Sequence, residues 1–174
     1  MLLRQLFDTE SSTYTYLLAD PASGKAILID SVVERLERDL QLLRELELEL
    51  AYAVDTHVHA DHVTASGVLR ERTGCRVVLS ERAGAVCPDV LVKQGDLLQL
   101  GDIQLEVRET PGHTSGCVSY VLNGDKAVFT GDALLVRGCG RTDFQQGDAR
   151  MLYRSVHSQL FTCLLYTSPS PRDS

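Results

Sequence analysis

The stretch Thr56-His57-Val58-His59-Ala60-Asp61-His62 decides how the rest of this sequence is interpreted. It contains three of the five histidines of the chain, and it begins where an apolar and aromatic stretch over residues 51–56 predicts a strand. Imidazole and carboxylate groups are ligands for zinc or iron, and loops at strand ends are common places for such sites. One histidine here would favour a solvated polar loop, whereas the H-x-H-x-D-H spacing predicts a metal site.

Two later motifs each place one more candidate ligand after a predicted strand. The residues T-P-G-H-T over 110–114 contain His113, and F-T-G-D-A over 129–133 contains Asp132. Each motif alone would indicate only a turn. Together with His57 they supply two histidines and one carboxylate, a set that leaves coordination positions open, as non-haem Fe(II) oxygenases require.

The other polar residues of the first motif have more than one interpretation. His59 is either a fourth metal contact or a group that orients the ligands. Asp61 and His62 either hold a second metal ion or orient the first set. His157 lies in a predicted helix and is interpreted as a helix-face or packing histidine.

The pattern along the chain predicts an α/β protein with two sheets covered by helices. Leucines at positions 36, 40, 43 and 46 follow helical spacing, and the stretches between turn signals are β-branched and apolar. We expect strands over residues 12–19, 25–30, 51–56, 76–79, 97–100, 103–109, 117–122 and 126–130, and helices over 33–48, 62–71 and 148–160.

Composition excludes several classes of function. The 174 residues are 44% hydrophobic and carry a net charge of −7, so there is no basic surface for nucleic acid or an anionic membrane. No apolar run is long enough to span a bilayer.

The five cysteines are scattered without a C-x-x-C pair, which indicates reduced thiols. The first residues resemble neither a signal nor a transit peptide, so we expect a cytoplasmic protein; a processed form from the mitochondrial matrix would look the same.

The motifs together resemble those of a known family. H-x-H-x-D-H, P-G-H-T and G-D-A are similar to the metallo-β-lactamase superfamily. Within it, the segments over residues 110–117 and 134–147, the latter including G-C-G-R-T-D-F-Q-Q-G, resemble the persulfide dioxygenases. The second segment separates these from the related hydroxyacylglutathione hydrolases (glyoxalase II). The resemblance covers about residues 2–161 and implies an αββα sandwich.

The resemblance also implies an activity and a set of roles. His57, His113 and Asp132 would bind one Fe(II) per chain, and glutathione persulfide, O₂ and water would give sulfite and glutathione. Arg141 would contact a carboxylate of glutathione through paired hydrogen bonds, unless it is a surface arginine. Cys139 would lie near the same pocket, unless it is a small packing residue. Dimers are common in such folds.

The resemblance stops near residue 161. We expect residues 1–161 to form an incomplete metallo-β-lactamase-like domain, with the C-terminal part of its second half missing. Residues 162–174 are expected to be a tail foreign to the family, either disordered or a translated artefact of a truncated reading frame. No histidine follows His157, so a two-metal hydrolase site could not be completed. The alternatives to a dioxygenase are therefore a hydroxyacylglutathione hydrolase and an inactive truncated fragment.

Overall fold

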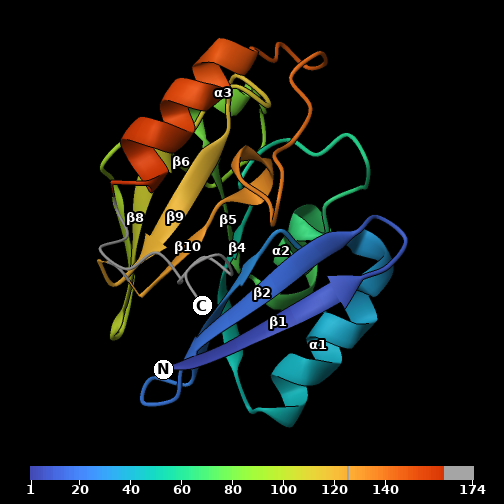
Figure 1. Cartoon of the computed structure of the whole chain (residues 1–174). Coiled ribbons are helices and arrows are strands. Elements are labelled where there is room, and N and C mark those ends of the chain that lie inside the picture. Colours follow the sequence, from blue (N-terminus) through green and yellow to red (C-terminus); the bar gives the residue numbers. More distant parts are fainter. Residues whose placement is uncertain (125, 163–174) are drawn as a thin grey trace, which may run out of the picture.

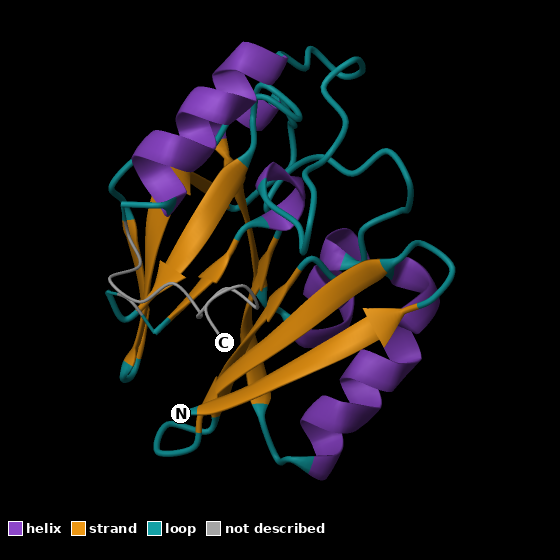
Figure 2. Ribbon diagram, in the orientation of Figure 1, coloured by secondary structure: helices purple, strands orange, loops and turns teal. Residues whose placement is uncertain are grey.

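The computed structural model of the protein describes residues 1–124 and 126–162. Two β-sheets face each other, and helices cover the outer side of each sheet (Figures 1 and 2). This αββα sandwich is the predicted fold class. The tail predicted from residue 162 onward lies, apart from Thr162, outside the described residues.

The first sheet is mixed and has the strand order β1-β2-β3-β4-β5-β6. Its first three strands are antiparallel neighbours, and β3 to β6 run parallel. The strand bounds are β1 (Leu2–Asp8), β2 (Thr13–Asp20), β3 (Lys25–Ile29), β4 (Glu49–Val54), β5 (Arg76–Ser80) and β6 (Val90–Val92).

The second sheet is antiparallel with the order β10-β9-β8-β7. Its strands are β7 (Leu97–Leu100), β8 (Ile103–Glu109), β9 (Val118–Leu122) and β10 (Ala127–Phe129). The helical elements are η1 (Val33–Arg35), α1 (Leu36–Glu45), α2 (Ser66–Thr73), η2 (Glu81–Ala83), η3 (Gly131–Ala133), α3 (Ala149–Ser155) and its π-helical continuation η4 (Val156–Leu160). Among the described residues, no helix combines the length and the apolarity needed to cross a bilayer.

Side-chain alternation along the strands builds the layers. In β3, Ile27 and Ile29 point into the core between the sheets, while Ala26 and Leu28 pack on the other face against the layer of α1 and α2. Successive side chains of a strand point to opposite faces, so an apolar run such as A-I-L-I fills both layers. Each fully buried aliphatic side chain stabilises the fold by roughly 1.5–3 kcal/mol.

A separate cluster joins the C-terminal helix to the loop that follows β10. Leu152, Val156 and Leu160 recur every four residues and pack on Ala133 of η3. The carboxylate of Asp148 caps the helix by accepting hydrogen bonds from the first backbone N–H groups. Helix α3 therefore supports a segment that also contains Asp132.

Two strands, β1 and β6, were not predicted from the sequence. In β1 the apolar residues come in pairs, at positions 2, 3, 6 and 7, so the period of two is absent, and the strand forms through antiparallel pairing with β2. Strand β6 has three residues and exists through its parallel pairing with β5.

Two predicted helices have different bounds in the structure. The helix expected over 62–71 begins only at Ser66, because the preceding backbone bonds to the segment after β3: Val33 N–H donates to Val63, and Ala65 N–H donates to Ser31. The helix expected over 33–48 begins with the 3₁₀ turn η1 and ends at Glu45, since the chain then turns into β4.

The two sheets are bonded to each other at the edge where β4 ends. The backbone N–H of Val118 donates to the carbonyl of Thr56 at 2.9 Å. The buried hydroxyl of Tyr120 donates to the carbonyl of Asp55 at 3.1 Å. The loop that carries the histidine motif is therefore held against the start of β9, and loops from both sheets meet there.

Candidate metal centre

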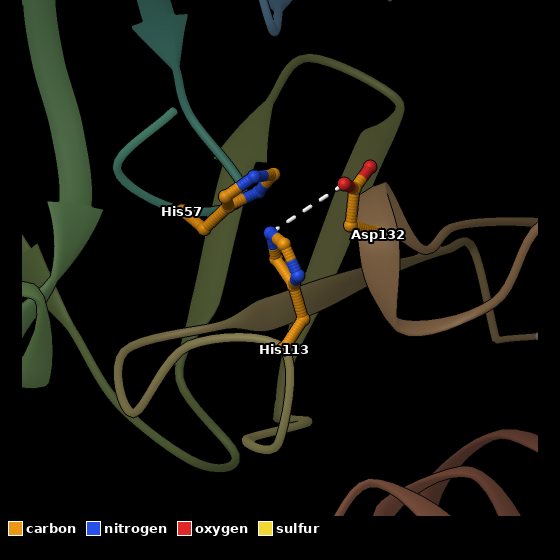
Figure 3. A group of neighbouring side chains, drawn as sticks. All are labelled: His57, His113 and Asp132. Atoms are coloured by element: carbon orange, nitrogen blue, oxygen red, sulfur yellow. Dashed lines mark ion pairs between the residues drawn. The ribbon is translucent and has the colours of Figure 1, made fainter. Parts of the chain in front are cut away.

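His57, His113 and Asp132 meet at this edge of the sandwich. They come from the loop that follows β4, the loop between β8 and β9, and η3. One ligand atom of each lies within 4.8 Å of the others. His113 Nε2 is 3.4 Å from Asp132 Oδ2, the contact dashed in Figure 3. Both histidines are buried and Asp132 is partly exposed, so the cluster has one open side.

The orientation of His113 is set by a backbone carbonyl. Its Nδ1 lies 2.7 Å from the carbonyl oxygen of Arg141. A carbonyl only accepts, so Nδ1 carries a proton, and the ring nitrogen that faces Asp132 and could bind a metal ion is Nε2. This arrangement is typical of metal-binding histidines, whose second ring nitrogen donates to a carbonyl or carboxylate.

Gly140 is a residue that the sequence did not single out for the site. A Cβ atom at this position would lie 2.7 Å from both Cβ and the carbonyl oxygen of Asp132, and 2.8 Å from Nδ1 of His113. Its backbone N–H donates to the Asp132 carbonyl at 2.7 Å. Gly140 thus packs directly against two of the three candidate ligands, and its only sequence signal is its place in the G-C-G segment.

The protonation of the cluster suits a cation. Burial, aided by the charge of His59, lowers the pKa of His57 to about 3, so this imidazole is neutral at pH 7. Burial raises the pKa of Asp132, which means that its carboxylate would gain from a nearby positive charge. Two histidines and one carboxylate fit a single metal ion and leave positions for other ligands.

His59, Asp61 and His62 form a second group beside the first. Their ligand atoms also lie within 4.8 Å of one another. His59 Nε2 is 3.2 Å from Asp30 Oδ1, so this side chain is bound to a buried carboxylate and is not part of the first group. His62 is near Asp61 at 3.3 Å through Nδ1, while its buried Nε2 has no hydrogen-bond partner among the described residues.

The His59–Asp30 pair predicts how the stability of the metal-free protein depends on pH. Burial alone would lower the pKa of His59, but the hydrogen bond and charge of Asp30 outweigh it and raise the pKa to about 9. The pair therefore stabilises the fold fully below the unfolded pKa of about 6.5. This contribution is lost as the pH rises through about 9, with a slope of up to ~1.4 kcal/mol per pH unit.

Urea unfolding of metal-free protein between pH 6.5 and 9.5 measures this loss. His59→Gln is the control, because glutamine can still donate to Asp30 and does not titrate. We expect a shallower decline of the free energy of unfolding in this variant. Equal slopes in the two proteins would show that the pair does not carry the pH dependence.

The structure places Arg141 and Cys139 beside a different cavity. The Arg141 side chain donates to both carboxylate oxygens of Asp143, at 2.8 and 3.1 Å, and both side chains are exposed. Arg141 and exposed Cys139 line a cavity of about 430 Å³ with residues of α3 and η4. A packing role for Cys139 does not fit this exposure.

A larger cavity is lined by two of the three candidate ligands. It has a volume of about 710 Å³, and its lining includes His57, His59 and Asp132. Tyr14 and Tyr16 of β2 also line it. Among the described residues, the two cavities share the lining residue Leu134. The predicted substrate-binding pair is therefore adjacent to the ligand cluster and does not share its cavity.

The αββα sandwich and its His–Asp cluster define the metallo-β-lactamase class, and the chain matches that superfamily over residues 8–171. It is 55% identical over 171 residues to the mitochondrial persulfide dioxygenase ETHE1 of Mus musculus, which covers 95% of this chain and 67% of the mouse protein. The crystal structure of ETHE1 from Myxococcus xanthus superimposes with a TM-score of 0.89 and 57% identity, over 93% of this chain and 71% of that one. The chain belongs to the persulfide dioxygenase family of the metallo-β-lactamase superfamily.

Hydroxyacylglutathione hydrolases are more distant relatives. One from a Bradyrhizobium species is 38% identical over 144 residues, covering 79% of this chain and 54% of the hydrolase. The prediction that the chain is more similar to persulfide dioxygenases than to hydroxyacylglutathione hydrolases is thus confirmed. Membership of the family implies that the protein has a metal site.

Proposed function

We propose that this chain carries the iron site of a persulfide dioxygenase that oxidises glutathione persulfide. The observation that supports this most is the set of two buried histidines and one aspartate that meet beside a cavity, which His57 and Asp132 line. A set of three protein ligands leaves room for both an oxidant and a substrate, as in other non-haem iron oxygenases. The family membership supports the same activity.

The overall reaction is balanced with dioxygen as the only oxidant. Glutathione persulfide, O₂ and water give glutathione, sulfite and two protons. The bond between the two sulfur atoms breaks, and the outer sulfur loses four electrons, which reduce O₂. Two oxygen atoms of sulfite come from O₂ and one comes from water.

Each part of the site has a distinct task in this proposal. His57, His113 and Asp132 would hold the iron. Iron(II) bound there would supply redox chemistry and a common point for both reactants. The cavity of about 710 Å³ is in the range of small-molecule sites, so it can enclose much of the substrate.

Arg141 remains the proposed contact for a glutathione carboxylate. Its present partner is Asp143, in an exposed ion pair. Such pairs contribute about 0–1 kcal/mol, so exchanging Asp143 for a substrate carboxylate costs little. Cys139, which lines the same cavity as Arg141, is proposed to lie near the bound substrate.

Metal content and product analysis test the proposal together. After anaerobic exposure to Fe(II) and Zn(II), we expect one iron per chain. Glutathione persulfide should then cause O₂ uptake and equal amounts of sulfite. Two metal ions per chain, with hydrolysis of a glutathione thioester and no O₂ uptake, would support the hydrolase instead. A chain with neither metal nor activity would support the inactive fragment.

The location and assembly of the protein remain predictions. The mouse relative is named as mitochondrial, whereas this sequence predicted the cytoplasm. The homodimer predicted by resemblance is tested by light scattering of the purified chain.

A further inference from the structure

The hydroxyl of Thr56 lies between a candidate metal ligand and a buried carboxylate. Its Oγ1 is 2.9 Å from Nδ1 of His57 and 2.9 Å from Oδ2 of Asp30. All three side chains are buried, with at most 5% of each residue exposed. Such contacts in the interior are shielded from competing water.

Counting hydrogens assigns the direction of each bond. Asp30 accepts at both oxygens: Oδ1 from the Thr56 backbone N–H at 2.7 Å, and Oδ2 from the Thr56 hydroxyl. A hydroxyl has a single hydrogen, which this second bond uses. The remaining contact of Oγ1 is therefore as an acceptor, and Nδ1 of His57 is its donor. The lone pair of His57 is then on Nε2.

The surrounding backbone keeps this hydroxyl in place. Asp30 has a φ of +51°, a left-handed conformation that costs free energy in a residue other than glycine. It is held by hydrogen bonds from its N–H to Val54 and from the Thr15 hydroxyl to its carbonyl. On the other side, a Cβ on Gly131 would lie 2.3 Å from Thr56 Oγ1, so only glycine fits against the hydroxyl.

We propose that Thr56 is a positioning residue of the metal centre. Its hydroxyl links the Asp30 carboxylate to His57, keeps the proton on Nδ1 and leaves Nε2 for the metal ion. His113 also carries a proton on Nδ1, but there the acceptor is the backbone carbonyl of Arg141. The two histidine ligands are thus fixed independently, one by a side-chain relay and one by backbone. The role toward a metal rests on the proposed function, but the hydrogen-bond relay does not.

The relay is tested first in the metal-free protein. Two-bond ¹H–¹⁵N correlation spectra of protein with ¹⁵N-labelled histidine show which ring nitrogen carries the proton. We expect His57 to be protonated at Nδ1 in the native chain and in Thr56→Ser, which keeps the hydroxyl. In Thr56→Val, which has nearly the same shape, we expect the Nε2-protonated form or a mixture. An unchanged His57 spectrum in Thr56→Val would overturn the relay.

Metal affinity tests the consequence. Competition with a chromophoric chelator gives the Kd for Zn(II), and anaerobically for Fe(II). Loss of an outer partner of a ligand typically weakens binding ~10–100-fold, which we expect for Thr56→Val but not for Thr56→Ser. Equal weakening in both variants, or none in Thr56→Val, would overturn the positioning role. If even the native chain binds no metal, the proposed function fails, while the spectra still decide the relay.

Discussion

His113→Ala is expected to remove tight metal binding and, with it, all sulfite formation. The substitution takes away one of three ligand atoms that lie within 4.8 Å of one another. Losing an outer partner costs up to ~100-fold in affinity, so losing a ligand itself should cost more than this. The protein should still fold, because His113 is in a loop and the sheets keep their cores. Metal analysis after gel filtration, with circular dichroism as a check of folding, measures the effect.

His157→Ala is the matched control. This histidine is exposed on η4, where its ring lies 4.1 Å from that of Tyr153, centroid to centroid. We expect native metal content. A His113→Ala protein that keeps one tightly bound metal ion would show that the ligand set is wrong.

Gly140→Ala is expected to damage the centre without removing any ligand atom. The added methyl group would lie 2.7 Å from Asp132 Cβ and 2.8 Å from His113 Nδ1, closer than carbon and nitrogen atoms can approach. Either Asp132 and His113 move apart or the Arg141 carbonyl turns away from His113. Overpacking of this kind costs typically 1–3 kcal/mol of folding free energy. We expect that loss of stability together with a weaker Kd for Zn(II).

Gly138→Ala separates this effect from a general loss of glycine. No atom lies within 4 Å of a Cβ added there, and its φ is not in the left-handed region. This variant should bind metal as the native chain does, and its stability should be unchanged or higher by up to ~1 kcal/mol, because the unfolded chain loses freedom. If the two variants have equal metal affinity, Gly140 does not position the ligands.

Local patterns predicted much of the fold, where each pattern matched its environment. Strands β7 and β8 have the predicted bounds, because turn residues separate their two stretches of sequence. Along β8, buried side chains alternate with less buried ones. Strands β1 and β6 lack such a pattern and form through backbone pairing with a neighbouring strand, β2 and β5 respectively. The start of α2 was predicted too early because bonds to residues 31–33 compete with the helix.

The sequence by itself determined which chemistry this protein can perform. Histidine and aspartate at strand ends, in that spacing, allow few uses other than metal binding, and these are properties of residue types and local order. Only the tertiary structure decided which atoms face one another. It brings His57, His113 and Asp132 together, and it pairs His59 with Asp30 instead. It also places the Arg141 side chain against Asp143 and the Arg141 carbonyl against His113. Those choices depend on contacts between residues far apart in the chain, and a local pattern carries no information about such contacts.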